Sequence, residues 1–145
     1  VFTWLGSLVV LLPLAVLLWW RQGKPAGFVA LALVTSSAVV HIAKLLLERP
    51  RPEYFPALID MPADASFPSA HAMQATAFAL AWLMQPGKSP GYLESGILFA
   101  AVALVGMSRL YLQVHFPSDV VAGVMFAALW VMCLRRLLAG REHKQ

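Results

Sequence analysis

The chain has 145 residues, of which 60% are hydrophobic and only 12% are charged, and its mean hydropathy is +0.72. Soluble domains usually carry about 25% charged residues, so this composition excludes an ordinary water-soluble protein. The net charge of +4 does not come from one aromatic-rich basic patch, which argues against nucleic-acid binding, and the single Cys133 excludes an internal disulfide.

Five apolar segments approach the roughly 20 residues that a helix needs to cross a bilayer. In chain order, the predicted spans are 1–20, 26–47, 67–85, 91–110 and 118–138. The last span is the weakest, because its uncharged stretch, Val120–Leu134, has only 15 residues. We therefore predict an all-α fold: an integral membrane bundle of about five transmembrane helices, forming a single domain over residues 1–145.

The connections between the spans alternate between two sides of the membrane. Side A holds the turns 21–25 and 86–90 and the tail after Leu134, whereas side B holds the loop 48–66 and the connection between the last two spans. Side A carries seven basic residues, which are Arg21, Lys24, Lys88, Arg135, Arg136, Arg141 and Lys144. Side B carries four, which are Lys44, Arg49, Arg51 and Arg109. The positive-inside rule therefore predicts that side A faces the cytoplasm and side B faces the periplasm or exterior.

The loop 48–66 on side B is rich in proline and also contains several large apolar residues. Proline at this density prevents a regular helix. The apolar residues can rest on the membrane interface, so the loop is either a lid over a substrate site or a plain interfacial connector.

The first polar cluster lies where the second span ends on side B. Lys44 and Arg51, followed by Pro52, have the spacing Lys-x6-Arg-Pro. Ionisable residues inside a membrane are costly and by default suggest function. Snorkelling of the basic side chains to the lipid headgroups would nevertheless explain this cluster if it stood alone.

The second cluster, Pro68-Ser69-Ala70-His71, lies at the start of the third span. We place Pro68 at the first helical position, where its missing amide donor costs nothing. The next free backbone amides and the Ser69 hydroxyl then form an anion-binding helix N-terminus, with His71 one turn in. A serine helix cap beside an interfacial histidine is the alternative.

The third cluster is the most specific. Ser108-Arg109 ends the fourth span, and His115 precedes Asp119, which opens the fifth. A carboxylate near a histidine can accept its Nδ1–H and leave Nε2 free to attack. Attack on phosphorus would give a phosphohistidine that water later resolves. A salt-bridged interfacial loop is the alternative, but it leaves His115 without a role.

Two other histidines carry less weight. His41 lies three residues before Lys44, and we interpret it as a satisfied polar contact rather than a catalyst. His143 lies in a charged tail, and we interpret it as solvated.

The three clusters, in this order, resemble the motifs of the type 2 phosphatidic acid phosphatase (PAP2) superfamily, K-x6-RP, PSGH and SR-x5-H-x3-D. The resemblance covers about Lys44 to Asp119 and departs from the family at Ala70, where glycine is usual. Alanine would cost about 1 kcal/mol if this position needed a positive φ, but nothing if it is helical, which we expect. Membrane members commonly have six helices, so we expect an additional helix or domain before Val1.

The resemblance implies a role for each motif residue. The phosphate-binding residues would be Lys44, Arg51, Ser69, Ala70 and Arg109, and the catalytic residues would be His115, His71 and Asp119. His115 would be the nucleophile, Asp119 would orient it, and His71 would protonate the leaving group. The resemblance implies neither a metal nor another cofactor.

These observations predict a metal-independent phosphatase that acts on a phosphomonoester or pyrophosphate lipid headgroup at the extracytoplasmic face of a bacterial inner membrane. Candidate substrates are a polyprenyl pyrophosphate, phosphatidic acid, phosphatidylglycerol phosphate and a lipid A phosphate. Two alternatives stay open: a lipid phosphotransferase that uses the same site, and a non-catalytic protein that binds or transports lipid headgroups. The vanadate-dependent haloperoxidases share the site but are soluble, and the five apolar spans argue against them.

Overall fold

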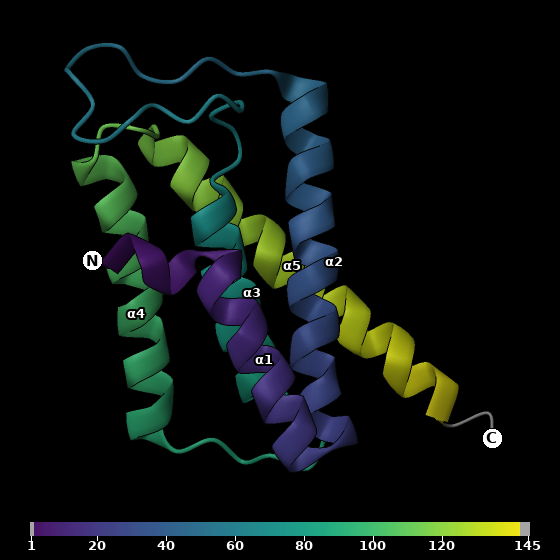
Figure 1. Ribbon diagram of the computed structural model, residues 1–145. Coiled ribbons are helices and arrows are strands. Elements are labelled where there is room, and N and C mark those ends of the chain that lie inside the picture. Colours follow the sequence, from purple (N-terminus) through teal and green to yellow (C-terminus); the bar gives the residue numbers. More distant parts are fainter. Residues whose placement is uncertain (1, 143–145) are drawn as a thin grey trace.

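The computed structural model describes residues 2–142, which form helices and connections without any strand (Figure 1). A short 3-10 helix, Phe2–Gly6, comes first. The α-helices that follow are α1 (Leu8–Gln22), α2 (Lys24–Leu47), α3 (Ala70–Leu83), α4 (Tyr92–Tyr111) and α5 (Pro117–Glu142). The predicted all-α bundle is confirmed, and each helix overlaps one predicted span.

Helix α3 lies at the centre of the bundle and contacts every other helix. Several of its inner residues are small, with Ala72, Ala77 and Ala81 fully buried beside the larger Met73. Small side chains let neighbouring helices approach closely, which is how helices associate in a membrane. The hydrophobic core therefore surrounds α3, and the polar start of this helix is held between its neighbours.

Helices α1 and α3 begin several residues later than predicted, because a serine caps each of them. The Ser7 side chain accepts a hydrogen bond from the backbone N–H of Val9, so α1 has only 15 residues. Ser69 caps α3 in the same way, so this helix has 14 residues. At 1.5 Å per residue, α3 is about 21 Å long, which is shorter than the roughly 30 Å hydrocarbon core.

Helices α2, α4 and α5 are each long and apolar enough to cross a membrane. The span predicted to be weakest belongs to the longest helix, α5, which has 26 residues. Arg135 and Arg136 continue this helix rather than ending it, since arginine is a good helix former whose long side chain can snorkel.

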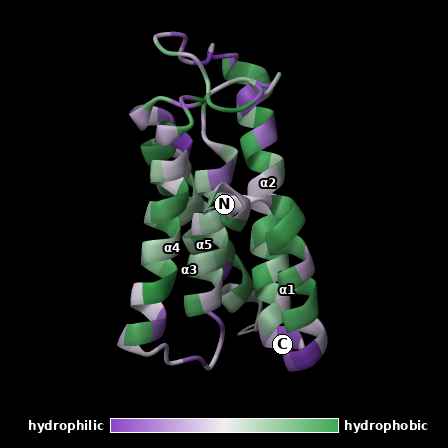
Figure 2. Cartoon of the chain, turned by 60° about the vertical axis from the view of Figure 1, so that its left-hand side comes forward, coloured by the Kyte–Doolittle hydropathy of each residue, from purple (hydrophilic) through white to green (hydrophobic). Residues whose placement is uncertain are grey.

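The outer faces of the helices are apolar, whereas hydrophilic residues gather at the two ends of the bundle (Figure 2). Large exposed apolar side chains occur on every long helix, for example Leu45 on α2, Leu93 on α4 and Val121 on α5. A water-soluble protein rarely exposes apolar surface on this scale. The chain is an integral membrane protein.

The connections next to the three clusters lie at one end of the bundle (Figure 1). The α2–α3 loop, residues 48–69, and the short α4–α5 connection, residues 112–116, are at this end, whereas the α1–α2 and α3–α4 turns are at the other. The predicted alternation of the connections is therefore confirmed. As expected from its prolines, the α2–α3 loop contains no helix.

Candidate active site

The first cluster is positioned by the end of α2. The helix ends at Leu47, and the next residue, Glu48, adopts a left-handed conformation with φ of 42°. The prolines at positions 50 and 52 prevent the helix from resuming. Lys44 is therefore in the last turn, with only 4% of its side chain exposed, and Arg51 returns toward it from the loop with 7% exposed.

The second cluster is a capped helix start. Ser69 is fully buried, and its hydroxyl accepts a hydrogen bond from the backbone N–H of Ala72 at 3.5 Å. Placing Pro68 at the first helical position was wrong: because Ser69 is the cap, Pro68 lies two residues before the helix. Ala70 is the first helical residue, and it is not among the described residues with positive φ. Alanine therefore fits this position without backbone strain.

The third cluster joins the end of α4 to the start of α5. Arg109 is 3% exposed, and its Nη1 donates to the Thr3 hydroxyl at 2.5 Å. His115 lies in the connection, and its Nδ1 is 3.5 Å from Oδ2 of Asp119. This distance is longer than a good hydrogen bond, although the two groups face each other. The Nε2 atom of His115 lies 3.5 Å from Nη1 of Arg51.

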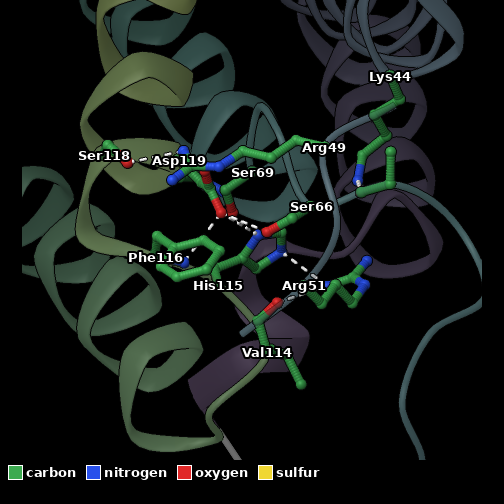
Figure 3. A network of polar contacts seen from close by, with 12 residues as sticks. Lys44, Arg49, Arg51, Ser66, Ser69, Val114, His115, Phe116, Ser118 and Asp119 are labelled. Atoms are coloured by element: carbon green, nitrogen blue, oxygen red, sulfur yellow. Dashed lines mark hydrogen bonds and ion pairs between the residues drawn. The ribbon is translucent and has the colours of Figure 1, made fainter. Parts of the chain in front are cut away.

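Asp119 is the centre of a polar network (Figure 3). Its carboxylate is fully buried. Oδ2 accepts hydrogen bonds from the backbone N–H of Phe116 at 2.9 Å and from the Ser66 hydroxyl, and Oδ1 pairs with Arg49 at 2.7 Å. Its backbone carbonyl accepts the N–H of Ser69 at 3.0 Å. The network ties the starts of α3 and α5 together and fixes the carboxylate beside His115.

Six of the eight predicted site residues line one cavity of about 250 Å³: Lys44, Arg51, Ala70, His71, Arg109 and His115. The other two, Ser69 and Asp119, do not line this cavity. Ser69 instead caps α3, and Asp119 lies behind His115. A second cavity of about 600 Å³, between the end of α2 and the loop, adjoins the first and shares Lys44 and Arg51 with it.

His115 lies outside the membrane-spanning segments, and its side chain is 2% exposed. Burial lowers its pKa below the ordinary 6.5; the Asp119 carboxylate opposes this shift, and the charges of Arg51, Arg109 and Lys44 add to it. Because its pKa is lowered, the imidazole is mostly neutral near pH 7. A neutral imidazole facing three cations can act as a nucleophile toward an anionic phosphoryl group.

Sequence reasoning missed four residues that contact the site: Thr3, Arg49, Asp64 and Ser66. Thr3 was assigned to a membrane span, and the other three were treated as loop. Arg49 is two residues before a motif arginine and Ser66 is three before the motif serine, so their closeness to the motifs was a signal. The Asp64 carboxylate pairs with both Lys44 and Arg51, at 2.9 and 2.6 Å. That pairing depends on the path of the loop and had no local signal.

The two remaining histidines are His41 and His143. Nδ1 of His41 lies 2.6 Å from the backbone oxygen of Ser37, which agrees with its interpretation as a satisfied polar contact, although the residue also borders the cavity. His143 and Lys144 lie outside the described residues.

Residues 25–142 match the family model described as the PAP2 superfamily. Decaprenylphosphoryl-5-phosphoribose phosphatase of Mycobacterium tuberculosis is 39% identical over 127 residues, covering 86% of this chain. The chain spans 64% of that relative's length. Phosphatidylglycerophosphatase B of Bacillus subtilis is 30% identical, with 88% of this chain and 67% of the relative covered. The crystal structure of a transmembrane PAP2-type phosphatidylglycerolphosphate phosphatase from Bacillus subtilis is similar, with a TM-score of 0.76 and 28% identity over 99% of this chain and 74% of the other.

Proposed function

The chain belongs to the PAP2 superfamily, and we propose that it is a membrane lipid phosphatase that hydrolyses a phosphomonoester or pyrophosphate headgroup. The relatives support this class of activity, because they are named as phosphatases of decaprenylphosphoryl-5-phosphoribose and of phosphatidylglycerophosphate. Both names describe a phosphate group carried by a membrane lipid.

One observation carries the proposal: Lys44, Arg51 and Arg109 come from three different parts of the chain and line the same small cavity as His71 and His115. Asp64 pairs with two of these three cations, and burying the remaining positive charge is costly unless a further anion binds. A phosphoryl group in its transition state spreads negative charge over three equatorial oxygens, which three cations can stabilise. These side chains supply the positive charge that metal ions provide in other phosphatases, and the proposed reaction is therefore independent of metal.

In the first step, Nε2 of neutral His115 attacks phosphorus. An N–P bond forms, the P–O bond to the lipid breaks, and the departing oxygen takes a proton from His71. Asp119 accepts the Nδ1–H of His115 and stabilises the positive charge that develops on the ring.

In the second step, water attacks the phosphohistidine. His71, now neutral, takes a proton from the water, the N–P bond breaks, and inorganic phosphate leaves. Both histidines return to their starting states, so one lipid phosphate and one water are consumed in each cycle.

The proposed location is the inner membrane of a bacterium, with residues 1–145 acting as one domain and the site facing the periplasm or exterior. The excess of basic residues at the opposite end of the bundle supports this orientation. Cysteine labelling tests it: with Cys133→Ser as background, a membrane-impermeant maleimide should label Glu53→Cys in intact spheroplasts. It should label Ser89→Cys only after permeabilisation, and the reverse pattern would invert the proposed orientation.

Phosphate release from a panel of lipids in detergent, with EDTA present, tests the function. The panel contains a polyprenyl phosphate and pyrophosphate, phosphatidic acid, phosphatidylglycerol phosphate and a lipid A phosphate. We expect activity on at least one lipid, and His115→Ala should lower kcat by at least about a thousandfold. Size-exclusion chromatography and the melting temperature establish that the variant is folded.

Three results would contradict the proposal in different ways. Activity that survives His115→Ala would exclude the phosphohistidine, and activity that disappears with EDTA would exclude the metal-independent reaction. Binding of lipid phosphates without release of phosphate from any of them would favour a headgroup-binding protein. Analysis of the products in the presence of alcohols separates hydrolysis from phosphotransfer.

A further inference from the structure

Asp64 belongs to the α2–α3 loop, and its side chain contacts two of the cations that line the smaller cavity. Its Oδ2 lies 2.9 Å from Nζ of Lys44, and its Oδ1 lies 2.6 Å from Nη2 of Arg51. The backbone oxygen of Asp64 also accepts a hydrogen bond from Nε of Arg51 at 3.0 Å. One residue therefore engages two of the three cations that the proposed function assigns to phosphate.

The two cations and the carboxylate have very different environments. The Lys44 and Arg51 side chains are 4% and 7% exposed, whereas the Asp64 side chain is 48% exposed. Asp64 lines both the 250 Å³ cavity and the adjoining 600 Å³ cavity. The cations are thus fixed in the protein, and the anion that pairs with them has open space beside it into which its side chain can turn.

A carboxylate and a phosphate can accept hydrogen bonds from these donors in a similar way. Each presents at least two oxygens on one central atom, and arginine binds either of them through parallel N–H groups. The Lys44 Nζ and the Arg51 guanidinium edge cannot bind a phosphate fully while they hold Asp64. Either the phosphate binds more weakly, or Asp64 leaves.

We propose that Asp64 is an internal anion that competes with phosphate for Lys44 and Arg51, so that substrate binding displaces its side chain and its return promotes release of the phosphate product. The inference rests on the proposed phosphate site and adds a residue that sets its affinity. Because the competition applies equally to any phosphate at this position, it weakens substrate and product binding alike, and its benefit lies in faster product release.

The charge state of Asp64 supports this role. The residue lies outside the membrane-spanning segments. Burial alone would raise the pKa of its carboxyl group, but the hydrogen bonds and charges of Lys44 and Arg51 outweigh burial and leave the pKa below its ordinary value. Asp64 is therefore an anion throughout the neutral pH range.

Titration calorimetry with inorganic phosphate, on the purified full chain in detergent, tests the proposal. We expect Asp64→Asn to lower the Kd for phosphate about five- to tenfold, because a partly exposed ion pair no longer has to be broken. Asp60→Asn removes the same charge from an exposed position in the same loop, and it should leave the Kd within twofold of wild type. Asp64→Glu keeps the charge and should stay closer to wild type than Asp64→Asn.

A Kd for Asp64→Asn that is unchanged or higher would overturn the inference, since it would mean that Asp64 merely holds the cations in place. If this variant does not fold, Asp64→Ser provides a second neutral replacement with the same expected tightening. Phosphate should also inhibit lipid hydrolysis at lower concentrations in Asp64→Asn than in wild type, in parallel with the lower Kd. If Asp64→Asn binds phosphate more tightly but the protein hydrolyses no lipid, the proposed function is refuted and the inference about Asp64 stands. If the protein hydrolyses lipid in a way that depends on His115, but Asp64→Asn binds phosphate no more tightly, the proposed function stands and the inference is refuted.

Discussion

Nη1 of Arg49 lies 2.7 Å from Oδ1 of Asp119, and this ion pair connects the loop after α2 to the first turn of α5 (Figure 3). The arginine also donates to the Ser118 hydroxyl at 2.8 Å, and its guanidinium lies 4.3 Å from the centre of the Phe116 ring. The other oxygen of Asp119 faces His115. Arg49 therefore positions the proposed nucleophile without contacting the cavity that His115 lines.

This relationship predicts a loss of turnover rather than of binding when Arg49 is replaced. Arg49→Met leaves a fully buried carboxylate without its cation, so Asp119 can shift or take up a proton and orient His115 less well. We expect kcat to fall roughly tenfold while KM stays within about twofold. Arg49→Lys keeps the positive charge but lacks the planar guanidinium group with its several N–H donors, and it should recover part of kcat.

Steady-state kinetics on the best lipid of the panel provides the measurement. A KM that rises while kcat is unchanged would place Arg49 among the phosphate-binding residues instead. A loss that is the same for the Met and Lys variants would mean that packing on Phe116, rather than charge, is what matters.

The lowered pKa of His115 predicts the pH at which activity is lost. The proposed nucleophile must be neutral, and its pKa lies below 6.5, so the acidic limb of kcat/KM should lie below pH 6.5, whereas the need for a protonated His71 sets a separate limb on the basic side. Asp119 raises the pKa of His115, so Asp119→Asn should move this acidic limb to still lower pH while reducing kcat.

The comparison between wild type and Asp119→Asn is the informative part of this experiment. The second ionisation of a phosphomonoester, near pH 6, affects both proteins equally and cancels in the difference. An acidic limb that moves to higher pH in Asp119→Asn would mean that the limb does not report His115.

Close packing of α5 on the start of α3 predicts opposite effects for two glycine substitutions in α5. A Cβ at Gly123 would lie 2.7 Å from the backbone oxygen of Ser69, whereas a Cβ at Gly140 would meet nothing within 4 Å. Backbone cannot move aside cheaply, so Gly123→Ala should lower the melting temperature by roughly 3–10 °C and reduce activity by displacing the cap of α3. Gly140→Ala should leave activity unchanged and slightly raise the melting temperature, because alanine favours a helix.

Thermal unfolding in detergent, followed by a lipid phosphatase assay on the same preparations, checks both substitutions. Gly123→Ala that is as stable and active as wild type would show that α5 does not approach Ser69 this closely.

The helices and the motif residues were predictable because their signals are local. The length of each apolar segment predicted a helix, and proline and serine residues indicated where some of the helices begin or end. The alternation of connections then placed Lys44, His71 and His115 at the same end of the bundle, without any knowledge of packing. The helix starts were less accurate, since both a proline at position 68 and a serine at 69 are good starting residues, and only the hydrogen bond to Ala72 distinguishes them.

Contacts made by segments without regular α-helical structure were not predictable. Asp64 pairs with Lys44, which lies 20 positions earlier in the last turn of α2, and Arg109 donates a hydrogen bond to Thr3 from the other end of the chain's motif region. No periodicity fixes the path of a proline-rich loop or of a 3-10 helix, so the sequence contains no spacing that would reveal these partners. The role of Asp119 beside His115 was predicted from their spacing, but the absence of Ser69 and Asp119 from the cavity lining needed three-dimensional geometry.

The helical conformation of Ala70 predicts the result of restoring glycine, the residue that is usual in the family. Ala70 begins α3 and has no positive φ, so glycine would bring no relief of strain and would only add conformational freedom to the unfolded chain. Ala70→Gly should leave kcat/KM within about twofold and destabilise the protein by at most about 1 kcal/mol. The lipid phosphatase assay and thermal unfolding measure the two effects. A gain in kcat/KM of fivefold or more would show that catalysis needs a backbone conformation at position 70 that alanine resists.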